Sequence, residues 1–140
     1  MPKIAETDHE IERCYAVIAE LRPDLEQSEF LPRVRQMASE GYRLAYLEDG
    51  PDVVAVAGYR ISTNLWLGRH LYVDDLVTAG QARSRGHGEA LLQWLCDEAR
   101  RAGCRTLDLD SGTQRARAHK FYFGQGMTIA GYHFVASLDL

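Results

Sequence analysis

Arg83, Gly86 and Gly88 have the spacing Arg-x-x-Gly-x-Gly, where a strand-like segment gives way to a helical one. The first backbone N–H groups of a helix have no intrahelical partner, and they carry partial positive charge. A turn that exposes these groups can therefore bind a phosphate, and Arg83 and Arg85 add positive charge beside it. A short Gly-x-Gly can also do no more than begin a helix, and taken alone the spacing leaves both interpretations open. We call residues 83–88 the basic turn.

The segments on either side of the basic turn favour the phosphate interpretation. Residues 70–78 have the composition of a strand, and residues 86–102 predict an amphipathic helix with Leu91, Leu95 and Ala99 on one face. The Lys-Ser/Thr pair of a nucleotide P-loop is missing. The sequence therefore predicts a phosphorylated cofactor at this turn, held by backbone groups.

Two carboxylates lie on the predicted strand that leads to the basic turn. Asp74 and Asp75 are adjacent, so the period-two alternation of a strand sends them to opposite faces of the sheet. Only one of them can then face a substrate, and the other is expected to be structural. An aspartate that is merely solvated or paired with a cation is the alternative for either residue.

The remaining elements predict an α/β fold with a mixed sheet and helices on both faces, in the order βααβββαβαβ. A first strand (4–7) is followed by a helix (11–21) that Asp8 could cap, and by a second helix (26–39). Residues 42–48 and 53–61 form a probable hairpin around the turn at 49–52. After the 86–102 helix come a strand (105–110), a short helix (115–125) and a final strand (128–138).

The composition limits the classes of function. The chain has 140 residues, 46% of them apolar, and we expect one domain spanning residues 1–140, without a membrane segment. Its 16 Lys and Arg against 20 Asp and Glu favour a small anionic ligand over nucleic acid. The N-terminus does not resemble a secretory signal, so a cytoplasmic protein is expected. Three cysteines, widely spaced, indicate reduced thiols and predict no metal site.

In these features the chain resembles the GNAT superfamily of N-acetyltransferases. The basic turn matches the family's Gln/Arg-x-x-Gly-x-Gly/Ala segment, which binds the pyrophosphate of acetyl-CoA. A second block around Ala118, Phe121, Tyr122 and Gly126 looks like the family's Ala-x-x-Phe-Tyr-x-x-x-Gly-Phe segment. Both blocks occur at the family's separation, and the order of elements fits from end to end.

The resemblance implies direct transfer of an acetyl group from acetyl-CoA to an amine. Tyr122 corresponds to the tyrosine that many members use as an acid toward the CoA sulfur. Asp74 corresponds to the first acid of a Tyr-x-Glu-Asp segment in the polyamine-acetylating branch, where it acts on the amine as a base or holds it by charge. The implied cofactor contacts are Leu76, Val77 and Thr78 through their backbone, Arg83, Ser84, Arg85, Gly86, His87 and Gly88 at the pyrophosphate, and Arg115.

The sequence also departs from the family at three positions. Arg115 stands where an asparagine is common, Met127 replaces a phenylalanine, and Thr78 replaces a valine. The acceptor is expected to be a small-molecule amine, with a protein lysine or N-terminus as the alternative. A noncatalytic module that binds acyl-CoA is the rival function, and a homodimer is compatible with the sequence.

Overall fold

The computed structural model describes residues 1–139, which fall into two compact units. Unit 1 is Met1–Leu109 and unit 2 is Asp110–Leu140. Each unit is described by itself. That residues 1–140 make one domain therefore stays a prediction from the sequence.

Unit 1 is a mixed sheet between two layers of helices. Its described strands are β1 (Lys3–Ile4), β2 (Arg43–Asp49), β3 (Asp52–Asn64), β4 (Gly68–Thr78) and β5 (Thr106–Leu109), which lie side by side in that order. The pairs β1–β2, β2–β3 and β3–β4 are antiparallel, and β5 runs parallel to β4. The predicted α/β class with a mixed sheet is therefore confirmed.

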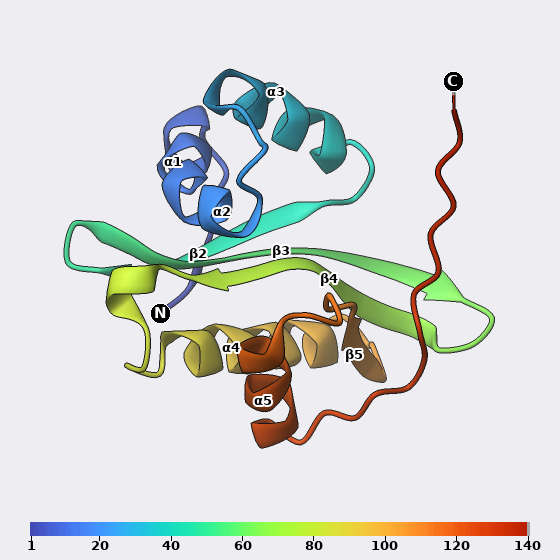
Figure 1. The fold of residues 1–140 in the computed structure, drawn as a ribbon. Helices are drawn as coiled ribbons and strands as arrows, with labels where there is room; N and C mark the ends of the chain where they lie inside the picture. The colour runs from blue at the N-terminus through green and yellow to red at the C-terminus, as the bar shows by residue number, and fades with distance from the viewer. Residues whose placement is uncertain (140) are drawn as a thin grey trace. The chain divides into compact units, whose positions relative to one another are not determined.

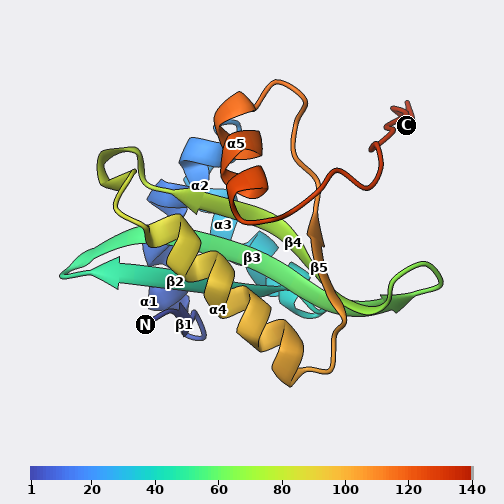
Figure 2. The same ribbon diagram turned by 90° about the horizontal axis from the view of Figure 1, so that it is seen from below.

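The helices of unit 1 cover opposite faces of this sheet (Figure 1). One face carries α1 (Asp8–Arg13), α2 (Tyr15–Leu21) and α3 (Gln27–Ala38), and the other carries α4 (His87–Arg101). Leu71 of β4 and Leu91 and Leu95 of α4 are completely buried, so α4 is held by its apolar face as its periodicity predicts. Figure 2 shows α4 lying across the strands.

The helix predicted at 11–21 is two helices, with Cys14 between them. The backbone N–H of Cys14 donates to the carbonyl oxygen of Ile11, three residues back, so the turn tightens there. The prediction that Asp8 caps this helix is also wrong. Thr7 is the N-cap, because its hydroxyl accepts from the Glu10 N–H and the Glu10 carboxylate accepts from the Thr7 N–H.

Unit 2 contains one helix among its described residues, α5 (Ala116–Gly124). The strand predicted at 128–138 does not form, since residues 127–139 have no regular secondary structure. The alternation of apolar side chains suggested a strand, but a strand also needs a neighbour for its backbone groups. The large apolar side chains of this segment are exposed instead: Ile129, Tyr132, Phe134, Val135 and Leu138.

No helix in residues 1–139 is both long and apolar enough to cross a bilayer.

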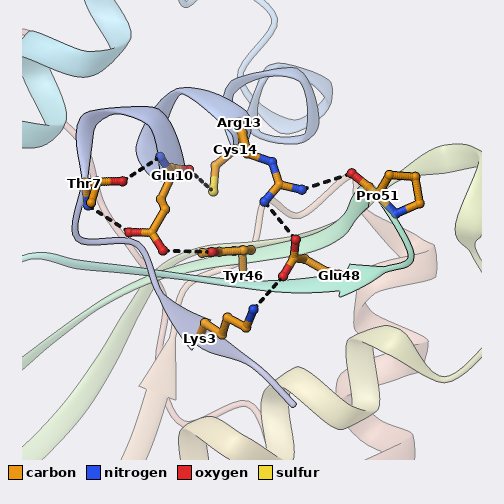
Figure 3. A network of polar contacts seen from close by, with 8 residues as sticks. All are labelled: Lys3, Thr7, Glu10, Arg13, Cys14, Tyr46, Glu48 and Pro51. Carbon is orange, nitrogen blue, oxygen red and sulfur yellow. Dashed lines mark hydrogen bonds and ion pairs between the residues drawn. The ribbon is translucent and has the colours of Figure 1, made fainter.

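A polar network ties the first helix to β2 (Figure 3). The Glu10 carboxylate accepts from the backbone N–H groups of Glu6 and Thr7, at 3.1 and 2.9 Å, and from the hydroxyl of Tyr46. Glu48 of β2 accepts from Lys3 and Arg13 at 2.9 and 2.8 Å. These contacts fix where α1 begins relative to the sheet.

The Glu10 network predicts a stability loss in acid. Hydrogen bonds from the backbone N–H groups of Thr7 and Glu6 lower the pKa of Glu10 from 4.5 to about 2. Because folding lowers the pKa of Glu10, the ionised Glu10 carboxylate stabilises the folded state fully above pH 4.5. This stabilisation is lost as the pH falls toward 2. Thermal melts should therefore show a smaller loss over this range for Glu10→Gln than for wild type. Glu12→Gln, which changes a carboxylate outside the capping box, should behave as wild type.

Candidate acyltransferase site

The basic turn follows a short 3₁₀ helix (Gly80–Ala82) and includes the first two residues of α4. Its backbone adopts the left-handed conformation twice, at Ser84 (φ 65°) and at Gly86 (φ 82°), the N-cap of α4. No described side chain caps this helix, so its first N–H groups are left for another partner. Arg83 and Arg85 are exposed on the same turn. The predicted features of an anion site are thus present together.

His87 adds an observation that the sequence did not supply. It is the first residue of α4, and its Nε2 atom is buried without a hydrogen-bond partner among residues 1–139. A buried ring nitrogen without a partner is costly unless a ligand satisfies it. The basic turn therefore combines uncapped helix N–H groups with an imidazole nitrogen that lacks a partner among the described residues.

The end of β4 has an open edge within unit 1. Leu76, Val77 and Thr78 pair with Ala57, Val56 and Ala55 of β3. On the other side, β5 pairs with β4 only from His70 to Val73. The β4 backbone beyond Val73 therefore has no strand neighbour on that side within Met1–Leu109, and it can bind an extended polar chain by strand addition.

The two carboxylates of β4 do not point to opposite faces, contrary to the sequence prediction. Gly58 of β3 pairs with Asp75 and the next residue, Tyr59, pairs with Val73, so β4 carries one extra residue at Asp74. Such a β-bulge breaks the period-two alternation. Asp74 and Asp75 consequently lie in one network on one face of the sheet.

That network joins both carboxylates to cations and to a buried phenol. The Tyr42 hydroxyl donates to Asp75 at 2.8 Å, and Arg22 donates to the Asp75 carboxylate and to the Asp74 carbonyl oxygen. The Nε of Arg60 lies 3.2 Å from both carboxylate oxygens of Asp74, and its guanidinium stacks over the Tyr42 ring. Asp75 is thus hydrogen-bonded to Tyr42 and ion-paired with Arg22, and Asp74 is ion-paired with Arg60.

The charge states in this network follow from burial. The Asp74 side chain is 22% exposed, and partial burial raises its pKa although Arg60 opposes the change. Burial, together with the negative charge of Asp75, raises the pKa of Tyr42 well above 10, so this phenol stays protonated and donates. Asp74 is therefore a better proton acceptor than an exposed aspartate.

Gly58 leaves room for the Tyr42 phenol. A Cβ built at Gly58 would overlap the phenol oxygen and ring of Tyr42. Gly58→Ala should therefore displace Tyr42 and lower the stability by about 2 kcal/mol, the usual cost of overpacking a core. A double-mutant cycle with Tyr42→Ala would check this by chemical denaturation. The alanine at position 58 should cost much less when Tyr42 is absent, and equal costs in both backgrounds would contradict the contact.

Tyr122 and Arg115 lie in unit 2, and the other predicted site residues lie in unit 1. Tyr122 is a half-buried residue of α5, and Arg115 is the N-cap residue of the same helix. Burial raises the pKa of Tyr122, and a hydrogen bond with Arg115 opposes that rise. Nε2 of His119 lies 2.8 Å from the carbonyl oxygen of Gly112. Within unit 2, then, Tyr122 is a protonated phenol beside a cation.

Sequence reasoning missed Arg22 and Arg60, which contact Asp74, and it did not connect Tyr42 with the two carboxylates. One signal for them was available, because a glycine within a strand rich in β-branched residues often marks a close approach of another group. Gly58 is such a glycine, and the approaching group is Tyr42.

Comparison with known proteins agrees with this geometry. The family model described as "Acetyltransferase (GNAT) family" matches residues 5–127. An uncharacterized N-acetyltransferase of Bacillus subtilis, YhdJ, is 37% identical over 122 residues, which make up 86% of each protein. An aminoalkylphosphonate N-acetyltransferase of Salmonella typhimurium is 32% identical over 69% of this chain and 62% of its own length.

A solved structure has the same fold at much lower identity. It is the aminoglycoside N-acetyltransferase AAC(6')-Iy in complex with CoA, with a TM-score of 0.86 and 12% identity. The alignment covers 100% of this chain and 96% of that one. The family match, the two N-acetyltransferase relatives and the shared fold lead to one conclusion: this chain belongs to the GNAT family of acetyltransferases and is an N-acetyltransferase.

Proposed function

We propose that this enzyme transfers the acetyl group of acetyl-CoA to the primary amine of a small molecule, directly and without an acetyl-enzyme. The observation that carries the proposal is the open edge of β4, which leads from Asp74 into the basic turn. This continuous stretch of unit 1 offers an acid–base group, free strand backbone and an anion site in that order along the chain. A cytoplasmic location and a homodimer remain predictions from the sequence.

The residues of the open edge and the basic turn fit acetyl-CoA. Leu76, Val77 and Thr78 would hold the amides of the pantetheine arm through backbone groups. The pyrophosphate would lie on the basic turn, where Gly86 and Gly88 leave the backbone accessible, Arg83 and Arg85 supply charge, and Ser84 and His87 supply polar side chains. Arg115 is proposed as a further contact. When bound, acetyl-CoA supplies an activated thioester.

Asp74 is proposed as the base that takes a proton from the acceptor amine. Its raised pKa supports this role, because a more basic carboxylate receives a proton more readily. Arg60, only 3.2 Å away, keeps the carboxylate ionised at neutral pH. The same negative charge would attract a protonated amine before the proton is removed.

Tyr122 is proposed as the acid that protonates the departing thiolate. The phenol must be protonated to do so, and its raised pKa supports this at neutral pH. Arg115 would stabilise negative charge on the phenol oxygen after the proton has left. Cysteine nucleophiles fit less well, because burial raises the pKa of Cys14 to about 12 and that of Cys96 above its usual range.

An acceptor that carries an anionic group as well as an amine suits the surroundings of Asp74. Arg22 and Arg60 flank the two carboxylates, and the Arg22 side chain is half exposed. The aminoalkylphosphonate N-acetyltransferase among the relatives supports such a zwitterionic substrate. We therefore rank aminoalkylphosphonates ahead of simple alkylamines, and both ahead of protein lysines.

The proposal is tested by measuring CoA thiol release from acetyl-CoA with three kinds of acceptor. These are an aminoalkylphosphonate, an alkylamine of equal length and a lysine-containing peptide. Mass spectrometry should find the acetyl amide on the small molecule, with the highest kcat/KM for the phosphonate. Acetylation of the peptide alone would contradict the proposed acceptor class.

A further inference from the structure

Ser62, His70 and Asp108 come together on one sheet face in unit 1, away from the proposed transfer site. Ser62 of β3 is directly opposite His70 of β4. His70 pairs with Thr106 of β5, so Asp108, two residues further along β5, faces the same side. His70 is four residues before Asp74 on β4, a separation of about 13 Å along a strand.

The three side chains are linked in the order nucleophile, base and acid. The Oγ of Ser62 lies 3.4 Å from Nε2 of His70, and Nδ1 of His70 lies 2.6 Å from the Asp108 carboxylate. His70 is only 6% exposed, whereas Ser62 is exposed and the Asp108 side chain is 33% exposed. A reagent can therefore reach the serine while the imidazole is held in place.

Asn64 fixes which nitrogen of His70 carries the proton. The Oδ1 of Asn64 accepts from the backbone N–H groups of Trp66 and Leu67, at 3.1 and 2.6 Å. Its NH₂ group therefore faces Nε2 of His70, at 3.3 Å, as a donor. Nε2 must then be the unprotonated nitrogen, and Nδ1–H donates to Asp108. This is the tautomer that a general base for serine needs.

The side-chain amide of Asn64 is a hydrogen-bond donor near Ser62. The Asn64 NH₂ and the Ser62 hydroxyl contact the same ring nitrogen, so the amide can reach a group attached to Ser62. Such a donor stabilises negative charge that develops on an oxygen during acyl transfer.

We propose that Ser62 is a nucleophile activated by His70 and Asp108, and that this second site accepts acyl groups from small activated esters. The Ser62 oxygen forms a bond to the ester carbonyl carbon while its proton moves to Nε2 of His70. The ester C–O bond breaks, and the alcohol leaves with that proton. Water then attacks the acyl-serine with His70 as base, which releases the carboxylic acid and regenerates Ser62.

A fluorophosphonate probe tests this assignment on the intact chain. Ser62 should displace fluoride and gain a stable phosphonyl group, which peptide mass spectrometry locates. Ser62→Ala should lose this label completely. Asp108→Asn keeps an acceptor oxygen for Nδ1–H but removes the charge, and should slow labelling by about 10²-fold or more.

Controls separate reactivity from folding. Ser39→Ala changes an exposed serine that donates to the backbone carbonyl of Gln36, and it should label like wild type. Melting curves for each variant show whether the fold is retained. If Ser62 of the folded wild-type protein gains no label, or labels equally fast in Asp108→Asn, the proposal is wrong and the contacts serve only to satisfy buried His70. Neither result would bear on acetyl transfer at Asp74.

Discussion

Asp74→Asn should lower kcat/KM for the acceptor amine by about 10²- to 10⁴-fold, the usual contribution of a general base. The raised pKa of Asp74 also sets the pH dependence. Protonation of the base abolishes its function, so the acid limb of the wild-type profile should lie above pH 3.8, the ordinary aspartate value. Arg60→Met removes the cation that opposes this rise, and should move the limb to still higher pH.

Stability measurements separate the role of Asp74 from a structural one. Because burial raises its pKa, ionised Asp74 costs the fold stability once the pH exceeds its folded pKa. Asp74→Asn should therefore melt at the wild-type temperature or above it at neutral pH. Asp75→Asn weakens the contacts with Tyr42 and Arg22, and should lower the melting temperature while keeping more activity. The opposite pattern of activity would make Asp75 the base.

Tyr122→Phe should lower kcat by about 10²-fold or more, with little change in the KM for acetyl-CoA. The ring remains to pack against Phe121, 5.6 Å away between centroids, so the variant removes only the proton donor. Burial raises the pKa of Tyr122 above 10, and the basic limb of the wild-type kcat profile should lie above that pH. That limb should disappear in the variant.

Tyr132→Phe is the matched control for Tyr122→Phe. Tyr132 is an exposed tyrosine of unit 2, 81% accessible, and the loss of its hydroxyl should leave kcat unchanged. Arg115→Ala provides a second check, because it removes the group that opposes the rise of the Tyr122 pKa. The basic limb should then move to higher pH. Full activity in Tyr122→Phe would remove the assigned acid.

The sequence predicted the elements around the basic turn better than the surroundings of Asp74. The strand before the basic turn and the helix after it are local, because glycine spacing and apolar periodicity encode them directly. Gly86 indeed adopts the left-handed conformation at the N-cap of α4. The relation of Asp74 to Asp75 depends instead on a bulge, which arises from how two strands pair and has no signal in either strand alone.

Two other differences between the sequence prediction and the structure also depend on non-local contacts. Ser62, His70 and Asp108 are separated by 8 and 38 residues, and only the registers of β3, β4 and β5 bring them together. The 128–138 segment has strand-like alternation, yet it forms no strand. Alternation predicts which side chains share a face, but it cannot supply a neighbouring strand.

Calorimetric titration with acetyl-CoA tests the central claim most directly, using Gly86→Asp and Gly103→Asp beside wild type. Both glycines have positive φ, 82° and 80°, and both have open space where a Cβ would go, so the backbone strain is matched. They lie at opposite ends of α4, and only Gly86 belongs to the basic turn. Binding by wild type and Gly103→Asp, lost in Gly86→Asp, is the expected result. Equal binding by all three, or none by wild type, would contradict a cofactor site at the basic turn.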